Sequence, residues 1–172
     1  MYSTIFTIII FLTPLVLLAS FIPGLSVAPF VPTMKKDVKR MVELAEILEG
    51  EVAYDLGCGD GRLLLEASKY KAQIVGVEVA PLMYAWTKLS LVFHRKKIRM
   101  ILNDLFRVDL READVIFFFL MPNVLPKLQE KILRECKKGC RVVSYSFPLE
   151  GWDADKVDQL LNRMPVYRYI VQ

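Results

Sequence analysis

From residue 33 onward, short unbroken apolar runs alternate with stretches in which apolar residues recur at every third or fourth position. The unbroken runs are typical of strands buried on both faces, and the wider spacing is typical of helices that bury one side. The runs predict strands at 51–56, 73–79, 98–102, 115–120, 141–147 and 166–171. The spaced stretches predict helices at 33–48, 62–71, 81–93, 124–137 and 153–164.

Residues at the ends of these stretches support several boundaries. Pro81 suits the first position of a helix, because its missing N–H would have no partner there. Gly50 is placed to end the helix at 33–48, and Asn123 is placed to cap the helix at 124–137. The range 105–113 predicts a polar connection between the third and fourth strands.

The alternation of strands and helices predicts the fold class. It indicates an α/β fold with a doubly wound, Rossmann-like, mostly parallel sheet and helices on both faces. In such folds a ligand binds beyond the carboxyl ends of the strands, near the point where the strand order reverses. The residues that directly follow the strands are therefore the candidates to bind a ligand.

A different pattern precedes this region. Residues 5–22 form a nearly unbroken apolar run, and the first charged side chain is Lys35. About 20 apolar residues cross a bilayer, and the basic residues follow the run, which favours a retained single-pass anchor with a cytoplasmic body. We expect a membrane anchor at 1–30 and a folded domain at 31–172. A cleaved signal peptide or a buried N-terminal helix is the alternative.

Charge and cysteine content give no sign of a nucleic-acid partner or a metal site. The 172 residues contain 23 Lys+Arg and 19 Asp+Glu, a formal net charge of +4. This mild excess, with one short basic run at 95–97, does not require a nucleic-acid partner. Cys58, Cys136, Cys140 and the lone His94 lack the spacing of a four-ligand zinc site, so we expect no metal.

The strongest chemical signal lies at 55–62, where the sequence reads D-L-G-C-G-D-G-R between a predicted strand and a predicted helix. Glycines at alternate positions let the backbone approach a ligand closely. A dinucleotide site would need a third glycine at position 62, which is Arg62, and a phosphate loop would need Gly-Lys-Ser/Thr. Asp55 would repel a pyrophosphate, but it suits a ligand that carries an ammonium and a sulfonium, as S-adenosylmethionine does.

Two further acids follow later strands. Glu78 lies 17 residues after Gly61, close to the ~20-residue offset at which an acid accepts hydrogen bonds from ribose hydroxyls. Asp104, next to Asn103, follows the strand at 98–102, and its carboxylate or a neighbouring N–H would read the adenine edge. Asp60, inside the glycine loop, is either a cofactor contact or a helix N-cap.

These motifs resemble a known family. D-L-G-C-G-D-G-R, G-V-E-V and N-D-L-F resemble the successive cofactor motifs of seven-β-strand, S-adenosylmethionine-dependent methyltransferases. V-P-T at 31–33, M-P at 121–122, and F-P at 147–148 with Trp152 resemble the mitochondrial lysine methyltransferases of the ATP synthase c-subunit and the adenine nucleotide translocase. Archaeal broad-specificity protein lysine methyltransferases belong to the same group. The resemblance covers roughly residues 30–152.

The resemblance implies a fold, a cofactor and a set of site residues. The family core closes with a hairpin of two strands, of which the sequence pattern indicates only one. Pro32 and Thr33 would close over the methionine end of the cofactor. The residues expected to bind S-adenosylmethionine are Pro32, Thr33, Asp55, Gly57, Cys58, Gly59, Asp60, Gly61, Glu78, Val79, Asn103, Asp104 and Leu105. The residues expected at the substrate channel are Met121, Pro122, Asn123 and Phe147.

The methyl acceptor follows from the same resemblance. A lysine side chain has an unperturbed pKa of ~10.4 and must lose its proton before transfer, which burial in an apolar channel favours. We expect methylation of lysine side chains in membrane proteins, and we assign no general base. The alternative is a methyltransferase for a lipid, quinone or other small molecule. A non-catalytic cofactor-binding protein is favoured least, because Asp55 and Glu78 are both present.

Overall fold

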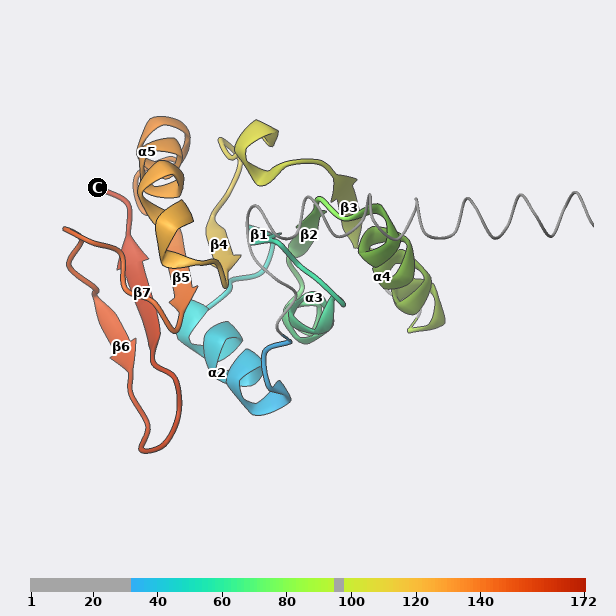
Figure 1. Cartoon of the computed structure of the whole chain (residues 1–172), viewed down its shortest axis with the longest axis horizontal. Helices are drawn as coiled ribbons and strands as arrows, with labels where there is room; N and C mark the ends of the chain where they lie inside the picture. The colour runs from blue at the N-terminus through green and yellow to red at the C-terminus, as the bar shows by residue number, and fades with distance from the viewer. Residues whose placement is uncertain (1–31, 95–97) are drawn as a thin grey trace, which may run out of the picture.

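The computed structural model describes residues 32–94 and 98–172, which form one seven-stranded sheet. The strands are β1 (Val52–Leu56), β2 (Gln73–Glu78), β3 (Arg99–Leu102), β4 (Val115–Phe118), β5 (Arg141–Tyr145), β6 (Lys156–Asp158) and β7 (Val166–Ile170). Their order across the sheet is β3-β2-β1-β4-β5-β7-β6. Figure 1 shows β3 at one edge of the sheet and the β6–β7 hairpin at the other.

The first five strands run parallel, and β7, which follows β5 in the sheet, runs antiparallel to it and to β6. β1 pairs with β2 on one side and with β4 on the other, so the strand order reverses at β1. A crevice beyond the carboxyl ends of the strands forms at such a point. The residues that follow β1, β2 and β4 therefore meet at one edge of the sheet.

Helices cover both faces of the sheet, as the sequence predicts. On one face lie α2 (Lys35–Ala45), α3 (Arg62–Ala67) and α4 (Pro81–Phe93), whose apolar residues pack with alternate strand residues such as Val115 and Phe117. On the other lie α5 (Leu125–Glu135) and the short helix η1 (Leu105–Arg107), packed with Ile116 and Phe118. A second short helix, η2 (Pro122–Val124), leads into α5.

The predicted helix at 153–164 is wrong. This range holds β6 and the loop of the β6–β7 hairpin, and β6 pairs with β7 through the registers Lys156↔Arg168 and Asp158↔Val166. The apolar residues Leu160, Leu161 and Met164 in this range are exposed at the tip of the hairpin. The hairpin supplies the two closing strands, of which the sequence pattern indicates only one.

Four smaller expectations also need correction. The helix predicted at 62–71 ends at Ala67. The helix predicted at 33–48 ends at Ala45, because Glu46 takes a left-handed conformation with φ 52°. The connection at 105–113 is not simply polar, since it buries Leu105, Val108, Leu110 and Ala113 against the α5 side of the sheet. Asn123 does not cap α5: η2 precedes that helix, and the N-cap position belongs to Val124.

The expected membrane anchor at 1–30 lies outside the described residues. Within residues 32–94 and 98–172, none of the helices has the length and apolar character needed to span a bilayer.

Candidate cofactor site

The glycine loop at 57–61 joins β1 to α3 with three left-handed glycines. Gly57, Gly59 and Gly61 have φ values of 89°, 52° and 78°, a region that favours residues without a Cβ. The N–H groups of Gly57 and Cys58 both donate to the Val77 carbonyl at 2.9 Å, and the Gly61 N–H donates to the Cys58 carbonyl at 2.9 Å. The loop is thus held against β2 by its own backbone.

Glu78, the last residue of β2, completes this arrangement. Its Oε2 accepts the Gly59 N–H at 3.0 Å, and its Oε1 accepts the N–H groups of Val79 and Ala80 at 2.9 and 2.8 Å. Four amides of the glycine loop therefore donate to protein oxygens. A phosphate site needs such amides to point at the ligand, so the loop lacks the character of a phosphate cradle.

Asp55 is a buried acid without a partner among the residues that the structure describes. Its side chain lies in β1 with 6% of its surface exposed, and none of the hydrogen bonds or ion pairs within the described ranges reaches it. Burial raises the pKa of Asp55 to about 8, and the charges of Glu78 and Asp60 add to the rise. A cationic group placed beside this carboxyl would reverse that penalty, so the site fits the ammonium and sulfonium of S-adenosylmethionine.

Cys58 does not face the crevice. Its side chain is 6% exposed and packs in the core with Leu64. A Cβ added at Gly76 would lie 3.0 Å from the Cys58 sulfur, so Gly76 leaves room for that side chain. Burial, with the charges of Asp55 and Glu78, raises the pKa of the Cys58 thiol. Cys58 thus supports the loop from beneath as a neutral, packed side chain.

Thr87 of α4 ties that helix to the loop. It is fully buried, and its hydroxyl donates a short hydrogen bond to the Gly59 carbonyl. A Cβ at Gly61 would come within 2.6 Å of the Thr87 methyl group. Thr87 can therefore pack closely against the start of α3 only because position 61 is glycine.

Asp60 and Arg62 connect the loop to the segment before α2. Arg62 donates through Nε to both Asp60 carboxylate oxygens at 2.9 and 3.0 Å, and through Nη1 to the Thr33 carbonyl at 2.5 Å. The N-cap of α3 is Gly61, and Asp60 accepts the Arg62 N–H only at 3.3 Å. The main partner of Asp60 is therefore the Arg62 side chain, which places Thr33, after the exposed Pro32, beside the glycine loop.

The residues after β3 reach the same edge of the sheet. The Asn103 N–H donates to the Glu78 carbonyl at 3.1 Å, and the Asn103 side-chain oxygen accepts the Asp104 N–H at 2.9 Å. Asp104 accepts the Phe106 N–H at 2.9 Å as the cap of η1, while Leu105 is buried. One carboxylate oxygen of Asp104 is thus occupied by the cap of η1. The backbone hydrogen bond from Asn103 to Glu78 holds the residues after β3 beside the end of β2.

The predicted substrate residues lie after β4 and β5. Met121, Pro122 and Asn123 are exposed, and Phe147 is half-buried. The Phe147 ring stacks with the Phe119 ring at a centroid distance of 6.4 Å. The sequence pattern places Phe119 in the core with its neighbours, but the structure leaves it half-buried beside Phe147. We call Phe119, Met121, Pro122, Asn123 and Phe147 the rim.

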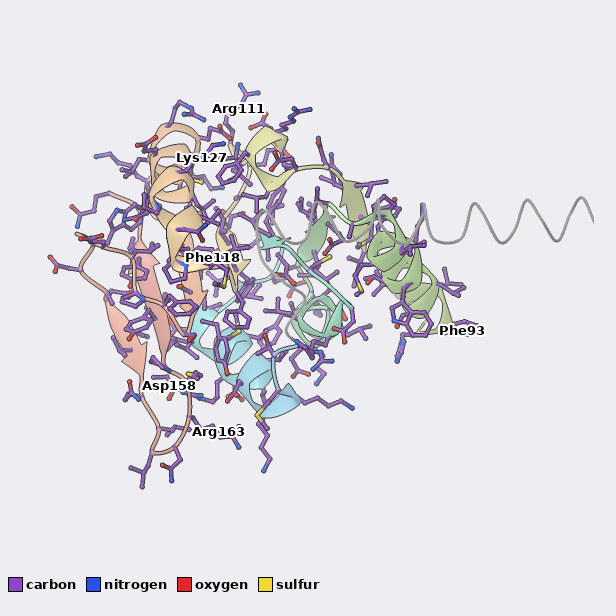
Figure 2. All side chains as sticks on the ribbon, viewed as in Figure 1. Phe93, Arg111, Phe118, Lys127, Asp158 and Arg163 are labelled. Carbon is purple, nitrogen blue, oxygen red and sulfur yellow. The ribbon has the colours of Figure 1, made fainter. Side chains whose placement is uncertain are left out.

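A buried charge cluster beside the rim was missed by sequence reasoning. Asp37 of α2 is 2% exposed and accepts hydrogen bonds from Tyr145 Oη at 2.9 Å, Arg40 Nη1 at 3.0 Å and Arg163 Nη1 at 3.1 Å. Burial alone would raise the pKa of Asp37, but these three donors lower it. Figure 2 labels Arg163 and Asp158 on the hairpin, and Asp158 also accepts from Arg40. One sequence signal could have indicated this cluster: Asp37 and Arg40 lie three residues apart, on the same side of the helix as the apolar Met41.

Tyr145 joins this cluster to the rim. It ends β5, and its ring meets the Phe119 ring edge-on at 5.0 Å. Burial of the ring and the hydrogen bond to Asp37 raise the pKa of Tyr145 to about 12. The cluster therefore fixes α2, the end of β5 and the hairpin loop against one another. Within the described ranges, no group of three or more His, Cys, Asp or Glu side chains is arranged to hold a metal ion.

Comparisons with known proteins agree with this geometry. Residues 55–156 match the family described as the ANTKMT methyltransferase domain. A protein-lysine N-methyltransferase of Saccharolobus islandicus is 36% identical over 151 residues, which cover 83% of this chain and 93% of the relative. The adenine nucleotide translocase lysine N-methyltransferase of Mus musculus is 34% identical over 134 residues, and the match spans 72% of this chain and 55% of that longer protein.

A solved structure carries the same fold together with a cofactor product. It is an RNA methyltransferase from Salinibacter ruber in complex with S-adenosyl-L-homocysteine, 34% identical, with a TM-score of 0.78 over 82% of this chain and 94% of that one. The family match covers more than half of the sequence, and the unpaired acid at the glycine loop, among the described residues, fits a cationic cofactor. The chain belongs to the ANTKMT methyltransferase domain family and is an S-adenosylmethionine-dependent methyltransferase.

Proposed function

We propose that this chain transfers a methyl group from S-adenosylmethionine to lysine side chains of proteins at a membrane surface. Asp55 carries the cofactor part of the proposal, because it is a buried acid that no described residue neutralises. The relatives from Saccharolobus islandicus and Mus musculus support the acceptor, since both are lysine N-methyltransferases by name.

We assign the cofactor contacts from the positions of the side chains. Asp55 would face the ammonium and sulfonium of the methionine end, and the lone pairs that Glu78 does not use would accept ribose hydroxyls. Asp104 or the N–H of Leu105 would reach the adenine edge. Pro32 and Thr33, held beside the loop by Arg62, would cover the methionine end.

The protein supplies orientation and exclusion of water. Bound S-adenosylmethionine provides the methyl group on a sulfonium, so the chain's residues need only align an amine with it. Met121, Pro122 and Phe147 present an apolar rim to the lysine side chain, and an apolar surround lowers the pKa of an amine. Asn123 adds a polar group at the mouth of this rim. No residue of the rim is assigned as a general base.

The membrane part of the proposal rests on the sequence. Residues 5–22 are nearly all apolar and carry no charge, and Lys35, Lys36 and Lys39 follow them. A retained segment of this kind would hold the methyltransferase domain at the cytoplasmic side of a bilayer. Lysines of membrane proteins that lie near the headgroups would then be within reach of the site.

Labelled cofactor tests the acceptor directly. Membranes are incubated with the full chain and S-adenosylmethionine labelled on its methyl group, and the label is followed into protein, organic extract and RNA. We expect label in protein that acid hydrolysis releases as methyl-lysine, and none when Asp55→Ala replaces the wild type. Label confined to the organic extract would favour the lipid or quinone alternative. Label confined to RNA would place this chain with the Salinibacter ruber structure instead.

A further inference from the structure

The outer face of α4 is an apolar stripe. Leu82, Trp86, Leu89 and Phe93 are 43%, 64%, 52% and 77% exposed. They follow one another at intervals of four, three and four residues, so they share one side of the helix. Val92, 68% exposed, widens the stripe at its end. We call these five residues the α4 stripe. Figure 2 labels Phe93 at the outer end of the helix.

The exposure of the α4 stripe does not come from a loosely attached helix. On the opposite side, Thr87 is fully buried and bonded to the Gly59 carbonyl, and Leu91 is 3% exposed in the core. A helix on the surface of a soluble domain normally turns charged or polar residues outward. α4 instead presents apolar side chains in both directions, which marks a surface that contacts something else.

The charges around the α4 stripe have one sign. Between Glu78 and Asp104 the sequence contains no Asp or Glu, and its charged residues are all Lys or Arg. Lys88 is exposed on α4, with its ammonium 5.5 Å from the Tyr84 ring, and Arg99 is exposed on the neighbouring edge strand β3. Basic side chains next to an apolar helix face are complementary to the headgroups of anionic lipids.

The aromatic content of the α4 stripe also matches a bilayer interface. Trp is enriched at the level of the headgroups, because its ring has an apolar body and a polar N–H. Trp86 stands in the middle of the stripe, between Leu82 and Leu89. The interface between a bilayer and water therefore accommodates the whole stripe without leaving a buried polar group unpaired.

We propose that the α4 stripe lies in the headgroup region of an anionic bilayer, a placement that rests on the membrane attachment proposed above. The apolar side chains would enter the boundary with the acyl chains while Lys88 and Arg99 meet phosphates. Because Thr87 ties the same helix to the glycine loop, this contact would fix the height of the cofactor site above the membrane. The site would then face along the membrane surface, where lysines of membrane proteins emerge.

The two tryptophans of the chain provide a matched test. The full chain is reconstituted in vesicles of phosphatidylcholine and phosphatidylglycerol, part of whose acyl chains carry bromine, which quenches tryptophan on contact. Trp152→Phe leaves Trp86 as the only reporter. Trp86→Phe leaves Trp152, which packs against Tyr169 at a centroid distance of 5.9 Å beside the hairpin, as the control.

We expect the Trp86 emission to be quenched severalfold more strongly than that of Trp152. Leu89→Glu, combined with Trp152→Phe, should bring Trp86 to the level of the control while leaving binding of S-adenosylhomocysteine unchanged. Equal quenching of the two tryptophans would overturn the proposal and favour a second copy or residues 5–22 as the cover of the stripe. If lysine methylation persists in that case, the proposed function stands and only the bilayer contact is wrong. Strong Trp86 quenching without lysine methylation would support the bilayer contact and overturn the proposed function.

Discussion

The carboxylate of Glu78 accepts the backbone N–H of Gly59 at 3.0 Å, which joins the end of β2 to the loop that follows β1. Glu78 therefore has two tasks in the proposed site, since it holds the loop and faces the ribose. Loss of the acid leaves up to three N–H groups, those of Gly59, Val79 and Ala80, without an acceptor.

We expect Glu78→Ala to weaken binding of S-adenosylmethionine about 10- to 100-fold, because hydrogen bonds from the ribose to a charged acceptor contribute about 1.5–3 kcal/mol. Titration calorimetry measures the change. Repeating it with a 2′-deoxyribose analogue of S-adenosylhomocysteine separates the two tasks. The analogue should bind the wild type more weakly than the parent compound, whereas Glu78→Ala should hardly distinguish them. Equal discrimination by both proteins would rule out the ribose contact.

The pKa of Asp55 makes cofactor binding depend on pH. A cation beside the carboxyl favours its charged form, so binding should release a proton at pH values below about 8, and affinity should rise towards that pH. Calorimetry in two buffers of different ionisation enthalpy counts the protons released. Asp55→Asn should bind more weakly and release none from this position. An unchanged proton count in that variant would contradict the assignment.

The same group affects stability without cofactor. Its pKa in the folded chain is about 8, above the unperturbed 3.8, so the folded state holds the proton more tightly than the unfolded state does. The associated stability is present in full below the unperturbed pKa and is lost as pH rises through about 8. We expect Asp55→Asn to reduce the fall in stability between these two pH values, as urea unfolding would measure. An identical pH dependence for wild type and variant would show that Asp55 has an ordinary pKa.

The close contact between position 61 and Thr87 predicts a rescue. Gly61→Ala should destabilise the fold by about 2–4 kcal/mol, because the new methyl group meets Thr87 and the backbone has a positive φ. Thr87→Ser removes the opposing methyl and keeps the hydroxyl, so the double variant should recover part of the loss in urea unfolding. Gly139→Ala is the control, with φ 84° and nothing within 4 Å, and it should show the backbone cost alone. A loss in Gly61→Ala no larger than this control would refute the contact.

The Arg62 contact predicts an effect on affinity with little effect on stability. Arg62→Ala frees the Thr33 carbonyl and should raise the KM for S-adenosylmethionine severalfold, while a partly exposed ion pair contributes only about 0–1 kcal/mol to stability. Arg111→Ala is a close control, because Arg111 pairs with Asp109 at the same two-residue spacing on an exposed surface. The control should leave the KM unchanged. A similar KM for both variants would argue against Thr33 as part of the site.

The sequence predicts the parts of the fold that local chemistry specifies. The six predicted strands and α4 are found close to their expected limits, because each carries its signal within its own residues: unbroken apolar runs, or Pro81 at the first turn. The glycine loop and Glu78 are equally local, and they meet because parallel strands end at one edge of the sheet. Which of the predicted residues touch the cofactor stays a prediction.

The features that sequence reasoning missed depend on contacts between distant residues. β6 has only three residues, and it is defined by pairing with β7 and by the Arg40–Asp158 ion pair across 118 positions. The Asp37 cluster likewise joins residues more than 100 positions apart, to Tyr145 and Arg163. Cys58 lies in a sequence motif for a ligand, but its side chain packs in the core, in the room that the missing Cβ of Gly76 leaves.

The bond from Thr87 to the Gly59 carbonyl has a consequence for cooperativity. The loop after β1 cannot open locally unless α4 also loosens, so the two should exchange their amide hydrogens as one unit. A ligand that orders the loop would then slow exchange along a helix it never contacts. Residue 87, which no motif singles out, would make that helix a reporter of whether the methyl donor is bound.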